Sequence, residues 1–381
     1  MRGSWLLLWL LALAAAFALG RFGSAGIGPD SSSVASFREV MDEDDPVVRA
    51  IGISRFFRRL SAENVGEVAE IVEAEKNWLS DPVLLQFMTA WTSFDELGAV
   101  DWAFTRSGHF RGRASAAVIE SLAFRNPSSA LSAIDALNDP TALDQLHDHL
   151  ISGWARSDSK DTLTRYITEI PRPMDRQRAT QILALEILKG GVEASIKWAD
   201  EIPDDADRNF KQTAVRRVAS DVAGIDPERA AQWIDGQRDR PYAPIARDAI
   251  ATRWVERDPE AAMNWLLTLP AGEERRKTIG STFSTWLKSD PSAATIWLRS
   301  ASPAKAVDPA IVVVVRRDSK RRPGSALDWA HLIHDDVLRR SALLGVGRRW
   351  LERNPKAFKA WLPKSGLQGD IRIEIMTPSP D

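Results

Sequence analysis

Apolar residues recur at helical spacing along most of this chain, and a tryptophan marks the same point of each recurrence. Trp233, Trp265, Trp297, Trp329 and Trp361 each lie 32 residues from the next. A fixed period of 20 to 50 residues is typical of repeat arrays, in which each copy stacks on its neighbour. The pattern therefore predicts a chain built from successive copies of one small helical unit.

Each copy begins with a helix start signal. Asp258-Pro259 and Asp290-Pro291 each place an acidic residue seven positions before a tryptophan of the series. The Asp carboxylate accepts from free N–H groups of the first turn, and Pro at the first helical position loses no hydrogen bond. A small residue three positions before the tryptophan, such as Ala262, leaves room for a neighbouring helix. Leu269-Pro270 then ends the helix, because the residue before Pro is disfavoured in α conformation.

A second helix completes each unit. Residues 273–288 carry apolar residues at helical spacing, and Trp254, Trp286 and Trp350 each lie eleven residues before a tryptophan of the main series. The predicted fold is therefore all-α, an α-solenoid of stacked αα-hairpins with a 32-residue repeat. Nine units are expected between about residue 95 and residue 362.

Two segments fit this pattern less well. Val312 to Val315 is a β-branched run that suits a strand, but the unbroken 32-residue phase across it favours a buried helix. Asp318 stands where a second-helix tryptophan is expected. The last unit has no recognisable second helix, since Ile371, Ile373 and Ile375 alternate with charged residues. This alternation predicts a strand that either caps the array or stays loose.

These patterns divide the chain into five parts. The expected parts are a signal peptide or N-terminal anchor over 1–20, a flexible linker over 21–47, N-terminal capping helices over 48–94, the repeat array over 95–362, and a C-terminal tail over 363–381.

The N-terminus predicts export. Arg2 precedes an apolar run from Trp5 to Leu19, and Ala18-Leu19-Gly20 places small residues at both positions that a signal peptidase reads. Fifteen helical residues span about 22 Å, short of a ~30 Å hydrocarbon core, which favours cleavage. Without cleavage, residues 5–19 would tether the chain to the inner membrane. The absence of cysteine favours a bacterial periplasm or cell envelope over an animal extracellular space.

Charge and motifs narrow the function. The net charge is −2, which gives no global attraction for nucleic acid. The sequence contains no nucleophile elbow, phosphate-binding loop or zinc-protease motif, and cysteine is absent. We therefore expect no enzyme, no catalytic residue and no cofactor.

Three groups of side chains are candidates for binding. The first is a basic cluster near the C-terminus, which either forms an anion-binding stripe on the second helices or complements helix dipoles at the surface. Its members chosen as binding residues are Arg316, Arg317, Arg321, Arg322, Arg339 and Arg340.

The second group is His331 and His334, three residues apart, with Asp335 and Asp336 next. Such a cluster could hold a divalent metal, but spacing supplies no further ligand, and the aspartates fit helix caps better. No metal site is predicted. His147 and His149 are two residues apart and do not share a helical face. The third group is the tryptophans themselves, which suit a core better than a sugar-stacking row.

In architecture the chain resembles the α-solenoid class of tetratricopeptide, Sel1-like and HEAT arrays over roughly residues 48–363. The Asp-Pro-x-x-Ala-x-x-Trp-Leu unit resembles helical repeats in uncharacterised exported bacterial proteins. The resemblance implies a scaffold and carries no reaction.

The leading hypothesis is a non-catalytic exported scaffold that binds a protein partner. One alternative is a cell-wall glycan-binding or lytic-enzyme accessory protein, since the predicted array resembles the helical part of some soluble lytic transglycosylases. Another is a structural protein that self-assembles through its strand-like tail. The identity of the partner and the oligomeric state do not follow from the sequence.

Overall fold

The fold is all-α, as the sequence predicts. The computed structural model describes residues 34–377 except 78, 140, 205–207 and 302–303. These residues are 77% helical and contain no strand. The chain divides into two compact units, one ending at Ile187 and one beginning at Leu188. The predicted signal segment, residues 1–20, lies outside the described residues.

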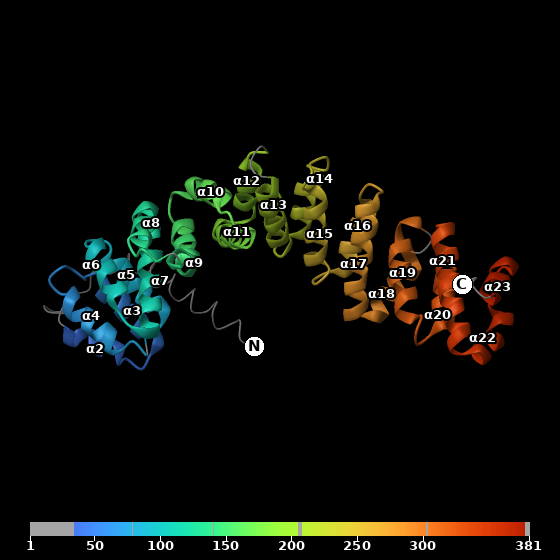
Figure 1. Ribbon diagram of the computed structural model, residues 1–381, viewed down its shortest axis with the longest axis horizontal. Coiled ribbons are helices and arrows are strands. Elements are labelled where there is room, and N and C mark those ends of the chain that lie inside the picture. Colours follow the sequence, from blue (N-terminus) through green and yellow to red (C-terminus); the bar gives the residue numbers. More distant parts are fainter. Residues whose placement is uncertain (1–33, 78, 140, 205–207, 302–303, 378–381) are drawn as a thin grey trace. The chain divides into compact units, whose positions relative to one another are not determined.

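The first unit contains ten helices among its described residues (Figure 1). In chain order they are α2 (Val34–Met41), α3 (Pro46–Phe57), α4 (Val65–Ala74), α5 (Asp81–Trp91), α6 (Glu96–Thr105), α7 (Gly108–Arg125), α8 (Pro127–Asp135), α9 (Ala142–Arg156), α10 (Lys160–Glu169) and α11 (Pro173–Leu188). Helix α7 packs against α5, α6, α8 and α9. It is therefore the central helix of this unit's core.

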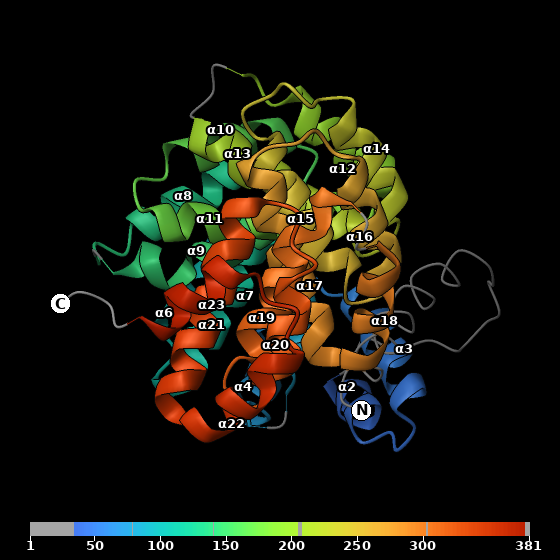
Figure 2. The same cartoon turned by 90° about the vertical axis from the view of Figure 1, so that its right-hand side faces the viewer.

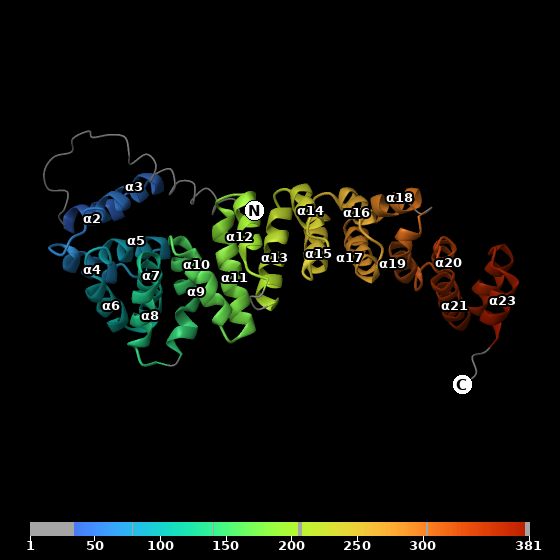
Figure 3. The same ribbon diagram turned by 90° about the horizontal axis from the view of Figure 1, so that it is seen from above.

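The second unit contains twelve helices among its described residues, and in most pairs a shorter helix precedes a longer one. Its helices are α12 (Val192–Glu201), α13 (Arg208–Ala223), α14 (Pro227–Asp235), α15 (Ala243–Trp254), α16 (Pro259–Thr268), α17 (Glu273–Ser289), α18 (Pro291–Ala301), α19 (Asp308–Asp318), α20 (Pro323–Ala330), α21 (Asp336–Arg353), α22 (Pro355–Trp361) and α23 (Gly369–Met376). Short 3₁₀ turns, η1 (Lys305–Val307) and η2 (Leu362–Lys364), precede α19 and follow α22. Figure 3 shows α14, α16 and α18 on one side of this unit and α15, α17 and α19 on the other.

The predicted helix starts are confirmed. Asp258 accepts from the backbone N–H of Ala261 at 3.0 Å, and Asp290 accepts from that of Ala293 at 2.9 Å. Asn354 does the same at α22. Helix α16 ends at Thr268, directly before Leu269-Pro270. Local sequence therefore sets where these helices begin and end.

Tryptophans from neighbouring helices pack against each other at the eleven-residue spacing. The ring centroids of Trp286 and Trp297 lie 5.6 Å apart, and those of Trp254 and Trp265 lie 5.7 Å apart. All four rings are buried, and the alanines three positions before the main series are also buried. The prediction that these tryptophans form core is confirmed.

The valine run is helical, as the repeat phase favours. Ile311, Val314 and Val315 are buried in α19, whereas Val312 and Val313 are only partly buried. Helical geometry separates the run into a core face and an outer face, which a strand would not do at this spacing.

The predicted strand near the C-terminus is wrong, because residues 369–376 form α23, which packs on α21 (Figures 1 and 2). Ile371 and Ile375 lie four residues apart, on one helical face, and both are buried, whereas Ile373 is 69% exposed. Gly347 in α21 lies directly against the side chain of Ile375, where a larger residue would leave too little space. The last predicted hairpin therefore has its second helix. The strand edge proposed for self-assembly is absent from this segment.

Part of the range predicted as a flexible linker is also helical. Helix α2 lies within residues 21–47, and the Phe37 ring packs 4.8 Å from that of Phe56 between centroids. A single buried aromatic residue is a weak signal in a short segment, so the sequence did not reveal it. Among the described residues, no helix combines the length and apolar character needed to span a membrane.

Candidate interaction surface

A groove of about 1010 Å³ runs over the second helices of the second unit. Its wall is formed by one face of α17, the outer face of α19 and the first turn of α21. The lining combines apolar side chains with five cations and two carboxylates. It contains two of the arginines predicted from the sequence, Arg316 and Arg317.

The outer face of α19 forms the middle of the groove. Pro309, Val312, Val313 and Arg316 line it at helical spacing, while the opposite face of the helix enters the core. The same β-branched run thus supplies both the core contacts of α19 and an apolar patch next to a guanidinium group.

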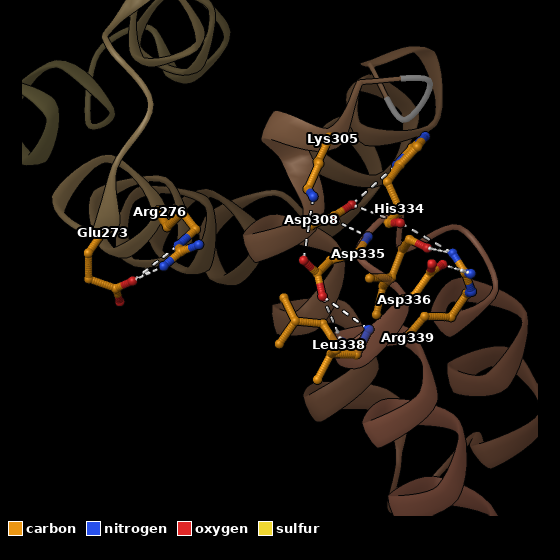
Figure 4. A network of polar contacts seen from close by, with 11 residues as sticks. Glu273, Arg276, Lys305, Asp308, His334, Asp335, Asp336, Leu338 and Arg339 are labelled. Atoms are coloured by element: carbon orange, nitrogen blue, oxygen red, sulfur yellow. Dashed lines mark hydrogen bonds and ion pairs between the residues drawn. The ribbon is translucent and has the colours of Figure 1, made fainter.

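A buried carboxylate sets the position of α21 beside α19 (Figure 4). Asp308 accepts from the backbone N–H groups of His334 at 2.9 Å and Asp335 at 2.8 Å. His334 Nδ1 lies 3.2 Å from the same Asp308 carboxylate. Because these three contacts span 26 to 27 residues of sequence, Asp308 connects the first turn of α19 to the loop before α21.

Asp335, which follows His334 in the loop, caps α21. Its carboxylate accepts from the backbone N–H groups of Val337 at 3.1 Å and Leu338 at 3.0 Å. The Leu338 N–H, together with Lys305 at 3.5 Å, holds the pKa of Asp335 below its ordinary value. The cap leaves Val337 77% exposed and Leu338 42% exposed at the edge of the groove.

Three cations in the groove are free of carboxylate partners within the described residues. Arg276 pairs with Glu273, and this contact raises the pKa of Arg276. By contrast, Lys277, Lys288 and Arg316 are exposed and make no ion pair with any described residue. The groove therefore presents uncompensated positive charge beside exposed apolar side chains.

The structure distributes the six predicted arginines over different roles. Arg317 and Arg322 both bind the buried carboxylate of Asp318, at 3.0 and 2.8 Å. Arg339 pairs with Asp336. Arg321 is exposed and lies outside the lining of the groove.

Arg340 joins α21 to α23. Its guanidinium contacts Asp370 at 2.8 Å and Glu374, and these contacts raise its pKa. The predicted stripe is therefore not continuous, since Arg316 and Arg317 alone of the six lie in the groove.

Neither histidine pair forms a metal cluster. His334 is engaged by Asp308, and Asp335 is a helix cap, as its position before α21 predicts. Within the part of the chain that the structure describes, no three His, Cys, Asp or Glu residues gather as metal ligands would. In the first unit, His149 contacts Glu120 at 3.0 Å, whereas His147 packs near the Tyr166 ring.

A smaller hollow of about 480 Å³ lies in the first unit beside His147 and Tyr166. Burial lowers the pKa of His147 and raises that of Tyr166. Both arginines at its rim are paired, because Arg172 contacts Asp144 at 2.6 Å and Arg178 contacts Asp148 at 3.5 Å. These arginines therefore do not supply the free positive charge that the groove has.

The sequence reasoning missed Lys277, Lys288, Val337 and Leu338. Lys277, Ser281, Ser284 and Lys288 recur at helical spacing in α17, so a polar face could have been read from the sequence. Their approach to the valines of α19 could not, because it depends on how the two helices pack.

Comparison of the sequence with protein-family models and with curated proteins gives no match. The structure by itself defines the class as an all-helical protein compatible with a helical-repeat architecture.

Proposed function

We propose that this chain is an exported, non-catalytic α-solenoid that binds a protein partner in the bacterial cell envelope. The groove over α17, α19 and α21 carries this proposal, because free cations and exposed apolar residues lie together there. Interfaces between proteins commonly combine an apolar centre with a polar rim.

Side-chain contacts support the 32-residue repeat within this proposal. Several hydrogen bonds join residues about one repeat apart, such as Arg257 to the carbonyl of Ile225 at 3.0 Å, 32 residues earlier. Arg353 makes a similar bond to the carbonyl of Lys320 at 2.7 Å. Contacts of this kind are expected where each hairpin packs on the preceding one.

The burial of the tryptophans favours a protein partner over wall glycan. Stacking on sugar rings needs an exposed aromatic face, whereas Trp233, Trp265, Trp297 and Trp329 are all buried. These four rings therefore do not supply a sugar-stacking row for the glycan-binding alternative.

Crosslinking in the native envelope tests the binding proposal. A C-terminally tagged chain would be captured and its partners identified by mass spectrometry, using Lys277→Glu/Lys288→Glu/Arg316→Glu as the groove variant. A control with the same charge change is Lys356→Glu/Lys359→Glu/Lys364→Glu, whose side chains are exposed outside the groove.

The expected result is one protein that is recovered with the native chain and the control variant but lost with the groove variant. Equal recovery from both variants, or recovery of wall glycan alone, would contradict the proposal. Arg317 and Arg322 are kept unchanged because they bind the buried Asp318, so their loss would disturb the fold as well.

Cell fractionation tests the export part separately. The mature chain is expected in the periplasmic or envelope fraction, with a mass that shows whether residues 1–20 have been removed. Retention of the full-length chain in the cytoplasm would contradict this part.

A further inference from the structure

We infer that the groove over α17, α19 and α21 binds an acidic amphipathic helix of a partner protein. This inference rests on the proposed function and specifies the chemistry of the partner. The charge of the lining, the apolar residues beside that charge and the surrounding helices support it.

The charge of the lining selects an acidic ligand. Five cations face two carboxylates in the groove, and both carboxylates are already engaged, Glu273 by Arg276 and Asp335 by Lys305. The free cations, Lys277, Lys288 and Arg316, come from two different helices, α17 and α19. Carboxylates on one ligand face could therefore meet cations on both helices.

The apolar residues require that the ligand is also amphipathic. Val312 and Val313 form a partly buried patch, while Val337 and Leu338 are exposed at its edge. A purely acidic chain would leave these side chains against water, whereas an apolar stripe would cover them. A nucleic acid fits poorly, since its binding depends mainly on phosphate contacts from Lys and Arg and would leave the apolar side chains of the groove uncovered.

The surrounding secondary structure favours a helical ligand. An extended peptide gains affinity by adding to an exposed strand edge, and the described residues contain no strand. A groove between helices instead accepts residues at positions i, i+3, i+4 and i+7 of an amphipathic helix. Crossing three helices that pack about 8–10 Å apart takes about 20 Å, or roughly 14 helical residues.

The test uses synthetic peptides and the full chain. The probe is an end-blocked, fluorescein-labelled 18-residue peptide, with leucine along one helical face and glutamate elsewhere. A second peptide replaces every glutamate with lysine, and a third replaces every leucine with serine. Binding is measured by fluorescence anisotropy at low and high salt.

We expect the acidic amphipathic peptide to bind and both altered peptides to bind at least about tenfold more weakly. The groove variant Lys277→Glu/Lys288→Glu/Arg316→Glu should also weaken binding of the acidic peptide by about tenfold, consistent with several exposed ion pairs. The variant Lys356→Glu/Lys359→Glu/Lys364→Glu should bind like the native chain. Higher salt should weaken binding, because the charges involved are exposed.

A second variant, Val337→Ser/Leu338→Ser, tests the apolar contribution without changing charge. It should weaken binding of the acidic peptide by about tenfold, because both side chains are exposed and would be covered by the ligand. Circular dichroism of each variant should match the native chain, since every altered side chain lies at the surface. If the charge-reversal variant failed to fold, Lys277→Gln/Lys288→Gln/Arg316→Gln would take its place.

Several results would overturn the inference. Equal binding of the acidic peptide to the native chain and the groove variant would place its site elsewhere. Equal binding of the leucine and serine peptides would show that the chain binds any acidic peptide without using the apolar residues of the groove. Groove-dependent binding to phosphatidylglycerol vesicles, without binding of the peptide, would assign the groove to a membrane surface.

Failure of this inference can be told apart from failure of the proposed function. A groove-dependent partner from crosslinking, together with no binding of the acidic peptide, would overturn the partner chemistry alone. The absence of any such partner would overturn the proposed function even if the synthetic peptide bound.

Discussion

The indole Nε1 of Trp297 donates a hydrogen bond to Oδ1 of Asn264, 33 residues earlier, at 3.2 Å. Asn264 directly precedes Trp265, which in turn donates to Asp235 at 3.2 Å. A buried tryptophan needs a partner for its N–H. Each of these rings therefore fills the core and also binds a polar residue of the preceding short helix.

Two substitutions at Trp297 can therefore measure the contribution of its packing and that of its hydrogen bond separately. Trp297→Ala should lower the free energy of unfolding by about 3–5 kcal/mol, as expected for a large buried side chain. Trp297→Phe keeps the six-membered ring but loses the pyrrole part and the bond to the exposed Asn264. A cost of about 0.5–1.5 kcal/mol for the bond and a small packing loss are therefore expected, which together stay below the cost of the alanine variant. Urea unfolding followed by circular dichroism measures both, with Asn264→Asp as a control that keeps the acceptor. A phenylalanine variant as unstable as the alanine variant would contradict this division.

Asp318 is a buried carboxylate at a position where the repeat predicts a tryptophan. It binds Arg317 and Arg322, and its side chain is only 4% exposed. Asp318→Ala should cost about 1–3 kcal/mol, since the arginines can still reach solvent and are not left buried without a partner. The comparison is Arg321→Ala, whose side chain is exposed and should change stability by less than about 0.5 kcal/mol. If thermal unfolding showed equal effects for the two variants, Asp318 would have no anchoring role.

Gly153 allows α9 to approach α7 closely. A Cβ at this position would overlap the carbonyl oxygen of Glu120 and lie 2.9 Å from the Cβ of Ala123. Gly153→Ala should therefore cost about 1–3 kcal/mol through overpacking.

Gly112 in α7 provides the matched control, because nothing lies within 4 Å of a Cβ placed there. Gly112→Ala should stabilise the protein by about 0.5–1 kcal/mol, the usual advantage of alanine over glycine within a helix. Denaturant midpoints of the two variants should move in opposite directions. A shift of both in the same direction would contradict the close approach inferred for α7 and α9.

His149 links stability to pH in the first unit. Its hydrogen bond to Glu120 raises the pKa of the imidazole above its ordinary value of 6.5. Because the pKa of His149 is higher in the folded state, the stability that its contact with Glu120 contributes is fully present below about pH 6.5. This contribution is lost as the pH rises through the pKa of His149 in the folded protein. The contribution of His149 to the free energy of unfolding should therefore fall as the pH rises above about 6.5.

His149→Gln should remove this part of the pH dependence, whereas His109→Gln should keep it, because His109 is exposed and has no ion-pair partner in the described residues. Urea titrations at several pH values supply the measurement. An unchanged pH dependence in His149→Gln would show that another group is responsible.

Much of the local structure could be predicted because its causes are local. Asp258-Pro259 starts a helix through a bond to the backbone three residues later, and Leu269-Pro270 ends it. The spacing of eleven between Trp286 and Trp297 already indicates that two consecutive helices bring their rings together, and they do.

The errors come from positions where distant residues decide. Ile371, Ile373 and Ile375 alternate like a strand, but burial of the first and last against α21 selects a helix. The basic cluster looked like one stripe because the sequence does not show which carboxylate each arginine meets. Arg340 binds Asp370, 30 residues away, and this contact joins α21 to α23.

By itself, the sequence determined the all-α class, the helix ends and the tryptophan core, because capping bonds and helical periodicity act over a few residues. The tertiary structure alone decided which surface stays available for binding. It brought Lys277 and Arg316 into one groove, and the bond from Asp308 to the loop before α21 placed Val337 at its edge. These relationships depend on how helices pack across tens of residues, and packing follows from the shape of the whole core.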